Sequence, residues 1–418
     1  MSDAKPLVIV GASYAGVQLA ASARELGFEE RIVIVGDERH APYQRPPLSK
    51  GLLTGKTSVD ALQLRSPDFF AQNRIELLLG RRAERVDVGA CRITLNDGAG
   101  LDYGWLALTT GARCRPFALG ANLEGVFNLR TLDDALRIVD AAARARRACV
   151  IGGGFIGLEV ASALRSRGVE VTVVEAQPRL LARAFPPGMS TYVEHAHRRR
   201  GTELSIGRGV RALHGEHGRV AAVELDDGSR IDCDLVVLGI GVLPNVELAQ
   251  QAGIAIDNGI VVDMLGRTSA PQVLAAGDVA NMALPPAPGA PARMRLESIQ
   301  SANDGARAAA SLTVGREQPC MAVPWFWSDQ FDLKFQMAGL PMPGDEAVLR
   351  GDMASDRFSV FYLRRGVLVA AHSVNKPAEH MQSRKLIGAR ARLTAAQLAD
   401  ESFDLKTATA LALEAAAS

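Results

Sequence analysis

The sequence lacks the features of a membrane protein, a disulfide scaffold or a nucleic-acid-binding protein. Its 418 residues contain no apolar run that reaches the roughly 18 residues needed to span a bilayer. The formal net charge is only +1, from 47 basic and 46 acidic residues, which argues against a basic field for nucleic acid. The five cysteines form no CxxC pair and are odd in number, as is typical of a reducing compartment; they are Cys91, Cys114, Cys149, Cys233 and Cys320.

We also expect no secretion signal. The segment MSDAKPLVIVGAS enters a strand-like apolar run after six residues and has neither a charged n-region nor a cleavage site. We therefore expect a soluble, cytoplasmic protein, and its length predicts about three domains.

Two segments of the chain look like copies of one βαβ unit. The first is LVIVGASYAGVQLAASARELG (7–27) followed by RIVIVGDE (31–38). The second is ACVIGGGFIGLEVASALRSRG (148–168) followed by VEVTVVEAQ (169–177). In each, a β-branched run leads into a glycine-rich turn, a helix-period stretch and a second strand closed by an acid. Two such units predict two dinucleotide-binding domains.

The second unit carries a complete dinucleotide fingerprint, GGGFIG (152–157). Its first glycine makes the turn, the second admits a pyrophosphate and the third lets helix and strand pack closely. Glu175 would accept hydrogen bonds from a ribose 2′-hydroxyl and repel a 2′-phosphate, which favours NADH over NADPH. Arg179 and Arg183 follow closely and leave the strictness of that preference open. The residues that we expect to bind the nicotinamide nucleotide are Gly152, Gly154, Ile156, Gly157, Glu175, Arg183 and Gly241.

The first unit is an imperfect copy, because Ser13 stands where the second glycine belongs. Serine adds a Cβ near the pyrophosphate, but its hydroxyl is also a hydrogen-bond donor. The repetition of the second unit, with Asp37 after the second strand, favours a nucleotide site here too. One class of enzyme needs two such sites: a flavoprotein that holds FAD in one domain and receives a hydride from a nicotinamide held in the other.

Three further segments support FAD. LALTTGA (106–112) is a strand that runs into Thr110 and Gly111, where the backbone could approach the nucleotide. TSAPQVLAAGD (268–278) is a strand that ends in Gly277 and Asp278, whose carboxylate could hold ribityl hydroxyls. RPPLSK is a rigid turn between Arg45 and Lys50 that presents its lysine over the first domain.

Missing motifs narrow the chemistry. A flavin disulfide reductase needs a redox cysteine close to the flavin, for instance within residues 41–50, but that stretch reads APYQRPPLSK. Four cysteines lie in or beside strand-like runs and are better interpreted as small core residues: Cys91, Cys114, Cys149 and Cys233. His195 and His197 lie on what reads as a solvated helix, and we predict no metal site. Flavin chemistry without a cysteine relay leaves electron transfer, oxygen reduction or quinone reduction.

The rest of the chain supplies turns and a third pattern. NDG (96–98) and DDG (226–228) predict hairpin turns, and MALPPAPGAPARM (282–294) predicts an irregular loop. From about residue 321 the pattern predicts an antiparallel sheet with a helix packed on it and a helical tail. We predict an FAD-binding domain from residues 1–115 and 245–320, an NAD-binding domain from 116–244, and an α+β C-terminal domain from 321–418.

Taken together, the motifs resemble the FAD-dependent, NADH-linked ferredoxin reductases of bacterial oxygenase systems. This group includes the putidaredoxin reductases that serve cytochromes P450 and the reductase components of Rieske-type dioxygenases. The resemblance runs from about residue 5 to 406 and rests on PYQRPPLSK, TTGA, LRTLDDA, IGGGFIGLE, VVEAQPRLLAR, GIGVLPN, AAGDV, RLESIQSAN and PWFWSDQ. It implies an α/β fold of the glutathione-reductase type, with two Rossmann-type domains and a smaller α+β domain.

The resemblance also implies site residues. Lys50 and Glu159 would form an ion pair beside the flavin N5, and Trp327 would lie near the isoalloxazine on the side where the iron–sulfur partner docks. The departures from the family pattern are Ser13 and Thr109, where glycine and alanine are common. The implied FAD contacts, with those from the segments above, are Gly11, Ser13, Ala15, Gly16, Asp37, Arg45, Lys50, Ala83, Thr110, Gly111, Arg130, Gly277, Asp278 and Ile299.

The resulting prediction is an NADH:ferredoxin oxidoreductase that binds FAD and NADH and reduces an acidic [2Fe–2S] ferredoxin. We expect the partner to dock on a basic rim of Arg307, Arg384 and Lys385 around Trp327. One alternative is an NADH oxidase or quinone reductase of the same fold. Another is an apoptosis-inducing-factor-like binding protein that NADH switches, although the near-neutral charge argues against a nucleic-acid role.

Overall fold

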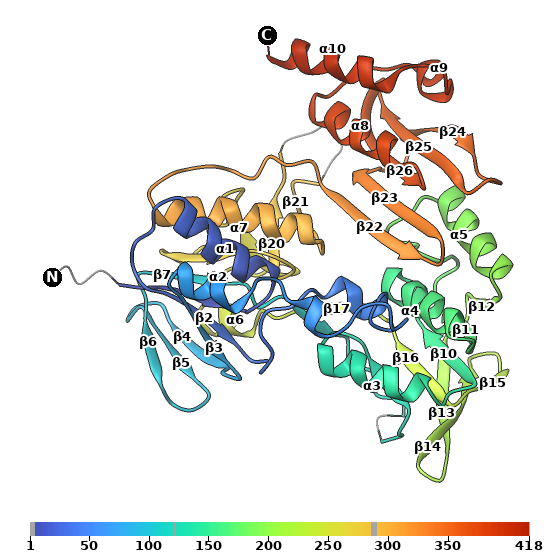
Figure 1. Cartoon of the computed structure of the whole chain (residues 1–418), viewed down its shortest axis with the longest axis horizontal. Coiled ribbons are helices and arrows are strands. Elements are labelled where there is room, and N and C mark those ends of the chain that lie inside the picture. The colour runs from blue at the N-terminus through green and yellow to red at the C-terminus, as the bar shows by residue number, and fades with distance from the viewer. Residues whose placement is uncertain (1–4, 121, 286–290, 418) are drawn as a thin grey trace. The chain divides into compact units, whose positions relative to one another are not determined.

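The chain folds into two compact units that are both of mixed α/β type (Figure 1). The computed structural model describes residues 5–120, 122–285 and 291–417. The first unit comprises Met1–Gln44, Gln63–Arg113 and Leu243–Phe326, and the second comprises Arg45–Leu62, Cys114–Val242 and Trp327–Ser418. Each unit contains one of the two predicted βαβ copies.

The first unit is built on a five-stranded parallel sheet. Its strand order is β19 (Val273–Ala275), β7 (Trp105–Leu108), β1 (Leu7–Val10), β2 (Ile32–Gly36) and β3 (Ile75–Leu79). The strands are near-continuous apolar runs because both faces of the sheet are covered. On one face, Leu7 and Ile9 pack under α1 (Tyr14–Glu25) and α7 (Ile299–Thr313), which lie side by side in Figure 1.

Smaller sheets cover the other face of this unit, where Val8 and Val10 point. One is antiparallel and consists of β4 (Ala83–Asp87), β5 (Arg92–Leu95) and β6 (Gly100–Asp102), with the predicted NDG turn between its last two strands. The other consists of β18 (Ile260–Val262), β20 (Ala280–Ala283) and β21 (Arg293–Arg295). Two short helices, α2 (Pro67–Gln72) and α6 (Glu247–Gln251), complete the unit.

The predicted irregular loop at 282–294 is shorter than expected at both ends. Strand β20 continues to Ala283, and β21 begins at Arg293. Residues 286–290 of that loop lie outside the described residues.

The second unit repeats the parallel architecture. Its sheet has the order β12 (Thr202–Ile206), β11 (Glu170–Glu175), β10 (Arg147–Ile151), β16 (Leu235–Leu238) and β9 (Val126–Asn128). The helices are α3 (Leu132–Ala142), α4 (Phe155–Ser166) and α5 (Pro187–Arg199), and α3 begins with a capping box. A three-stranded sheet, β13 (Val210–Glu216), β14 (Arg219–Leu225) and β15 (Arg230–Asp232), contains the predicted DDG turn.

The C-terminal segment is the predicted antiparallel sheet with helices. Its strand order is β22 (Trp325–Gln330), β23 (Leu333–Gly339), β26 (Val367–Val374), β25 (Arg357–Arg364) and β24 (Glu346–Asp352). Helix α8 (Pro377–Gly388) packs on this sheet, and α9 (Ala395–Ala399) and α10 (Leu405–Ala417) follow. The segments β8 (Ala112–Cys114) and β17 (Val242–Pro244) lie where the chain passes from one unit to the other.

Helix α5 is one of the elements of the second unit that contact the C-terminal sheet. The ring of Tyr192 lies 4.7 Å from that of Phe358, and its hydroxyl donates to Asp356 at 2.7 Å. His197 of the same helix is fully buried, so the prediction of a solvated helix was wrong for this face. The buried side of α5 consists of four apolar residues together with Ser190 and His197; the apolar ones are Met189, Tyr192, Val193 and Ala196.

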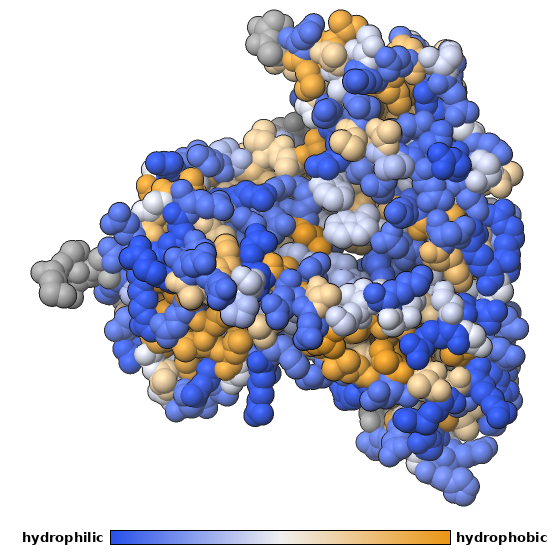
Figure 2. Space-filling model, viewed as in Figure 1, coloured by the Kyte–Doolittle hydropathy of each residue, from blue (hydrophilic) through white to orange (hydrophobic). Residues whose placement is uncertain are grey.

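The cysteines divide into two groups. Cys149 and Cys233 are buried core residues, as predicted, and burial raises the pKa of the Cys233 thiol to about 12. Cys91 and Cys114, which we also predicted to be core residues, are only half-buried, as is Cys320, and all five are free thiols. Among the described residues no helix is long and apolar enough to cross a membrane, and hydrophilic side chains cover much of the face seen in Figure 2.

Candidate functional site

The first glycine-rich turn joins β1 to α1, and two of its glycines are required by the backbone. Gly11 has a φ of +124°, and a Cβ there would lie 2.1 Å from the carbonyl oxygen of Thr109. A Cβ on Gly16 would lie 2.0 Å from the carbonyl oxygen of Gly11. Any side chain at either position would therefore separate α1 from the strands.

The two departures from the family pattern are both accommodated at this turn. Ser13 is the N-cap residue of α1 in an extended conformation, and its hydroxyl makes no capping hydrogen bond. Thr109 is buried, and its hydroxyl lies 3.1 Å from the carbonyl oxygen of Val10 and 3.0 Å from that of Gly11. The Thr109 side chain thus ties β7 to the turn, a contact that alanine could not make.

The other predicted FAD residues of the first unit gather around the same end of the sheet. Gly277 has a φ of +80°, and a Cβ there would lie 3.0 Å from the Cβ of Ala15 in α1. The Thr110 hydroxyl donates to the carbonyl oxygen of Asn245 at 2.8 Å, which holds the turn at Gly111. Residues at the ends of parallel strands meet there, as a nucleotide site requires. The remaining predicted residues lie after β2, at the start of β4, after β19 and at the start of α7; they are Asp37, Ala83, Asp278 and Ile299.

The second turn, between β10 and α4, contains one glycine that the packing of the protein does not require. A Cβ on Gly152 would lie 2.3 Å from the carbonyl oxygen of Gly239, and one on Gly157 would lie 2.0 Å from that of Gly152. A Cβ on Gly154 would have no neighbour within 4 Å. The protein itself therefore does not demand glycine at 154, and the open space at the N-terminus of α4 fits a bound pyrophosphate.

Glu175 lies at the end of β11, beside this turn. Its Oε2 accepts a hydrogen bond from the backbone N–H of Gly153 at 2.6 Å, and its Oε1 accepts one from that of Gln177 at 2.6 Å. Each carboxylate oxygen keeps a second lone pair, so these bonds orient the group without saturating it. The sequence predicted the acid, but its anchoring on the glycine turn is visible only in the structure.

The arginines that follow Glu175 differ in their surroundings. The Arg179 guanidinium donates to the carbonyl oxygens of Ala182 and Phe185 and to the Ser190 hydroxyl, at 2.7 Å for Ala182 and 2.8 Å for Ser190. These hydrogen bonds of Arg179 stabilise the loop that follows β11. Arg183 is exposed, and its guanidinium lies near Gly241, the last of the predicted nicotinamide-domain residues.

The second unit contains an ion pair between a half-buried lysine and a buried glutamate. The Nζ of Lys50 lies 2.6 Å from the Oε2 of Glu159, with side-chain exposures of 18% and 1%. Lys50 follows a short 3-10 helix, Pro46–Ser49, whose two prolines set its start, while Glu159 lies in the second turn of α4. Arg45 anchors the segment by donating to the carbonyl oxygen of Arg130 at 2.7 Å. The two residues paired by resemblance therefore do meet.

Two hydroxyls beside this pair were missed by the sequence reasoning. The Oγ of Ser49 donates to Glu159 Oε2 at 2.5 Å, and the Oγ of Ser328 donates to Oε1 at 2.6 Å. Ser49 immediately precedes Lys50, so its proximity could have been foreseen. Ser328 lies 169 residues from Glu159, and its only signal was its alternation with Gln330 along a strand.

The predicted docking residues are distributed over both units. Arg307 lies on α7 of the first unit and pairs with Asp304 at 2.8 Å. Trp327 lies in β22, and Arg384 and Lys385 lie on α8, all three in the second unit; Trp327 and Arg384 are half-buried and Lys385 is exposed.

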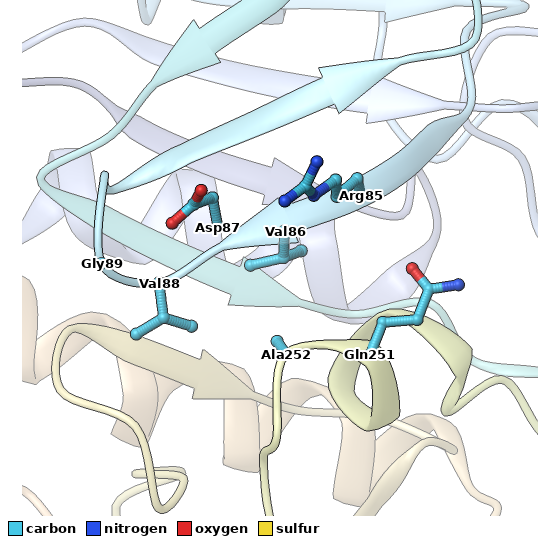
Figure 3. Close-up of a pocket in the computed structure, with 7 residues that line it drawn as sticks. All are labelled: Arg85, Val86, Asp87, Val88, Gly89, Gln251 and Ala252. Atoms are coloured by element: carbon cyan, nitrogen blue, oxygen red, sulfur yellow. The ribbon is translucent and has the colours of Figure 1, made fainter.

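A surface hollow in the first unit is lined by none of the predicted site residues. Figure 3 shows that it is lined by residues of β4 and its following turn and by the C-terminal end of α6; they are Arg85, Val86, Asp87, Val88, Gly89, Gln251 and Ala252. Among the described residues no three histidine, cysteine or acidic side chains gather as a metal site. His197 instead hydrogen-bonds to Gln330 at 2.9 Å.

Comparison with known proteins assigns the family. The pyridine nucleotide-disulphide oxidoreductase model matches residues 5–306, and the reductase C-terminal model matches residues 325–409. Rhodocoxin reductase of Rhodococcus erythropolis is 44% identical over 405 residues, which cover 97% of this chain and 94% of that protein. The ferredoxin–NAD(+) reductase component of the anthranilate 1,2-dioxygenase system of Burkholderia cepacia is 41% identical over 408 residues, covering 97% and 99%. The chain belongs to the ferredoxin reductases of the pyridine nucleotide-disulphide oxidoreductase family.

A solved structure agrees with this membership. The covalent putidaredoxin reductase–putidaredoxin complex matches this reductase with a TM-score of 0.93 and 38% identity, covering 98% of this chain and 99% of that chain. The predicted α/β fold with two dinucleotide-binding units is thereby confirmed. The reductase is an enzyme that binds FAD and NAD(H), and its two glycine turns fit those groups.

Proposed function

We propose that this reductase is an NADH:ferredoxin oxidoreductase that serves a cytochrome P450 or Rieske-type oxygenase. Where a related disulfide reductase needs a redox cysteine, this chain instead holds Lys50 against the buried carboxylate of Glu159. That observation carries the proposal, because such a pair can position a nicotinamide but cannot relay electrons through a disulfide. When bound, FAD supplies the chemistry, since it accepts a hydride and releases electrons singly.

The residues of the chain divide this work among them. We propose that the turns at Gly11–Gly16 and Gly152–Gly157 hold the two pyrophosphates against helix N-termini. Asp37 and Glu175 would accept hydrogen bonds from the ribose hydroxyls. Lys50 and Glu159 would orient the nicotinamide ring, since a buried charged pair with fixed donors is a rigid reference point. We propose that the other predicted cofactor residues contact FAD or NADH as assigned from the sequence.

The arrangement of the sheets supports a division into three domains. Each unit contains a parallel sheet around one glycine turn, and the second unit also contains the antiparallel C-terminal sheet. We propose that the FAD-binding domain comprises 1–115 and 245–320, the NAD-binding domain 116–244 and the C-terminal domain 321–418.

A direct experiment tests the function. The holoenzyme is supplied with NADH, and the rates of reduction of a [2Fe–2S] ferredoxin, a quinone and oxygen are compared. A ferredoxin reductase should reduce a suitable ferredoxin far faster than oxygen or quinone. Faster reduction of oxygen or quinone would instead identify an oxidase or quinone reductase, and slow turnover with every acceptor would identify an NADH-switched binding protein.

The nicotinamide preference should depend on Glu175. Replacing it by alanine removes hydrogen bonds from a charged acceptor, each of which contributes about 1.5–3 kcal/mol. We expect Glu175→Ala to raise the KM for NADH and to narrow the ratio of kcat/KM for NADH over NADPH by about tenfold or more. Steady-state kinetics with both nucleotides measures this ratio.

A second variant removes the charge of Glu175 but keeps its hydrogen bond to the glycine turn. Glu175→Gln keeps an oxygen that can accept from the Gly153 N–H but no longer repels a 2′-phosphate. It should also narrow the ratio. If neither variant changes it, Glu175 does not contact the ribose.

We further propose that the partner is an acidic ferredoxin that docks near Trp327, where Arg307, Arg384 and Lys385 steer it. Putidaredoxin reductase, a relative of similar fold, forms a complex with putidaredoxin. A protein of near-zero net charge must steer an acidic partner through local basic residues. The side chains of Arg307 and Lys385 are exposed, which such steering requires.

Charge reversal tests this docking proposal. Combined reversal of Arg307, Arg384 and Lys385 should slow ferredoxin reduction strongly at low salt, and less so at high salt, where screening is already extensive. Reduction of a small uncharged acceptor should not change. Arg211→Glu, which reverses an exposed charge on β13, is the matched control. If ferredoxin and small-acceptor activities fall together, or neither falls, the partner docks elsewhere.

A further inference from the structure

The carboxylate of Glu159 is held on both of its oxygens. Oε2 accepts from Lys50 Nζ at 2.6 Å and from Ser49 Oγ at 2.5 Å. Oε1 accepts from Ser328 Oγ at 2.6 Å. The Ser49 and Lys50 donors come from one short segment, whereas Ser328 comes from β22 in the C-terminal sheet. Ser328 thus holds the oxygen that faces away from the lysine.

The hydrogen bonds continue beyond Ser328. Gln330 donates from Nε2 to Ser328 Oγ at 3.0 Å, and its Oε1 lies 2.9 Å from His197 Nε2. Ser328, Gln330 and His197 each have 0% of their surface exposed. Ser328 and Gln330 project from the same face of β22 because side chains of a strand alternate. A buried series of hydrogen bonds therefore runs from α5 through β22 to Glu159.

The donor and acceptor groups fix the direction of these hydrogen bonds. An amide oxygen only accepts, so His197 must carry its proton on Nε2 and donate it to Gln330. Ser328 accepts from the Gln330 amide, which directs its own hydroxyl proton to Glu159. Every donor thus points towards the carboxylate, and bonds aligned in this way reinforce one another.

The state of His197 agrees with this direction. Among the described residues its Nδ1 has no hydrogen-bond partner, so a proton on that nitrogen would have no acceptor, whereas one on Nε2 has Gln330. Burial, with a contribution from Arg200, lowers the pKa of His197 to about 4 although the bond to Gln330 opposes the change. The imidazole therefore stays neutral near neutral pH and keeps its proton on Nε2.

We propose that Ser328 is a positioning residue that fixes the Glu159 carboxylate against Lys50, and that Gln330 and His197 hold Ser328 in turn. The proposal rests on the proposed role of Lys50 and Glu159 towards NADH. The Glu159 carboxylate ends a side chain with three rotatable bonds, so it can turn away from Lys50 unless both of its oxygens are held. The C-terminal sheet would thus set the geometry of a group on the nucleotide-binding helix α4.

A mutant cycle in the holoenzyme tests the proposal. Ser328→Ala should slow flavin reduction by NADH, followed by stopped-flow absorbance, by about tenfold, the cost of one hydrogen bond to a charged group. In a Glu159→Ala background the same change should cost less than about twofold, because the acceptor is already gone. Ser328→Thr, which restores a hydroxyl, should recover most of the rate.

A second measurement reads Lys50 without any turnover. The sequence has seven lysines, so the rate of acetylation of each can be followed by mass spectrometry. An ammonium held by a fixed carboxylate reacts slowly, so Ser328→Ala should speed the labelling of Lys50 several-fold but leave Lys56 unchanged. This readout needs neither NADH nor ferredoxin.

A second serine of the same sheet provides the control variant. Ser373→Ala removes another buried hydroxyl of the same sheet, one that contacts Ser359 at 2.9 Å rather than Glu159, and should change neither readout. Equal effects of Ser328→Ala with and without Glu159, or unaltered labelling of Lys50, would overturn the positioning role. If the cycle shows coupling but no ferredoxin is reduced, the positioning role stands and the proposed function fails.

Discussion

Lys50→Met and Glu159→Gln should each slow the reduction of bound flavin by NADH by about 30- to 100-fold. Breaking a buried pair by removing one partner costs about 3–5 kcal/mol, and the partial exposure of Lys50 reduces that figure. Lys50→Met should have the larger effect, because it leaves a carboxylate that is 1% exposed with only hydroxyl donors. Glu159→Gln leaves a lysine that can still turn towards water.

The double variant tests whether Lys50 and Glu159 act together or independently. Residues in contact are not additive, so Lys50→Met combined with Glu159→Gln should cost clearly less than the product of the single effects. Stopped-flow flavin reduction at saturating NADH measures all four proteins. Lys56→Met is the control, because this exposed lysine lies in the same segment. Multiplicative effects of the two changes, or an equal loss in the control, would contradict a functional pair.

Mild acid should destabilise the second unit through three buried histidines. Burial lowers the pKa of His372 to about 3, and burial together with a nearby arginine lowers the pKa values of His197 and His380 to about 4. Arg200 is that arginine for His197, and Arg384 is for His380. All three rings are held neutral in the folded protein, whereas an unfolded histidine binds a proton near pH 6.5.

The sign of the effect follows from proton binding. Below pH 6.5 the unfolded state binds more protons than the folded state, so the free energy of unfolding falls as the pH is lowered. The stabilisation is complete above pH 6.5 and is lost progressively down to about pH 3–4. For a single histidine whose pKa falls from 6.5 to about 4, acidification from neutral pH to below pH 4 lowers the free energy of unfolding by about 3 kcal/mol. Carboxylates act at lower pH, since a hydrogen bond from Arg200 lowers the pKa of Asp332 below its usual 3.8.

Hydrogen exchange measured between pH 7.5 and 5 tests this expectation. After correction for the intrinsic exchange rate, protection should fall first in β25 and β26 of the second unit. Strands β1 and β2 of the first unit should keep their protection, because the six histidines other than His40 all lie in the second unit. His372→Gln should flatten the pH dependence of β26. Equal loss of protection in both units, or no effect of the variant, would rule out the histidines as the cause.

The sequence by itself determined the features that depend on local steric and periodic rules. The two βαβ units could be predicted because continuous β-branched runs, glycine turns and terminal acids follow directly from chain geometry. Gly11 and Gly152 must be glycine because their φ values are +124° and +113°, and that demand is visible in the motif itself. Lys50 and Glu159 were paired only through family resemblance, because nothing in their spacing brings them together.

Only the tertiary structure decided which groups surround that pair. Ser328 reaches Glu159 across 169 residues of sequence, and Gln330 reaches His197 across 133, so no local pattern could report either contact. His197 looked solvated because its helix carries charges on one face, yet packing of the C-terminal sheet buries the other. Buried polar contacts between distant segments depend on how sheets and helices pack, and hydrophobic periodicity carries no information about them.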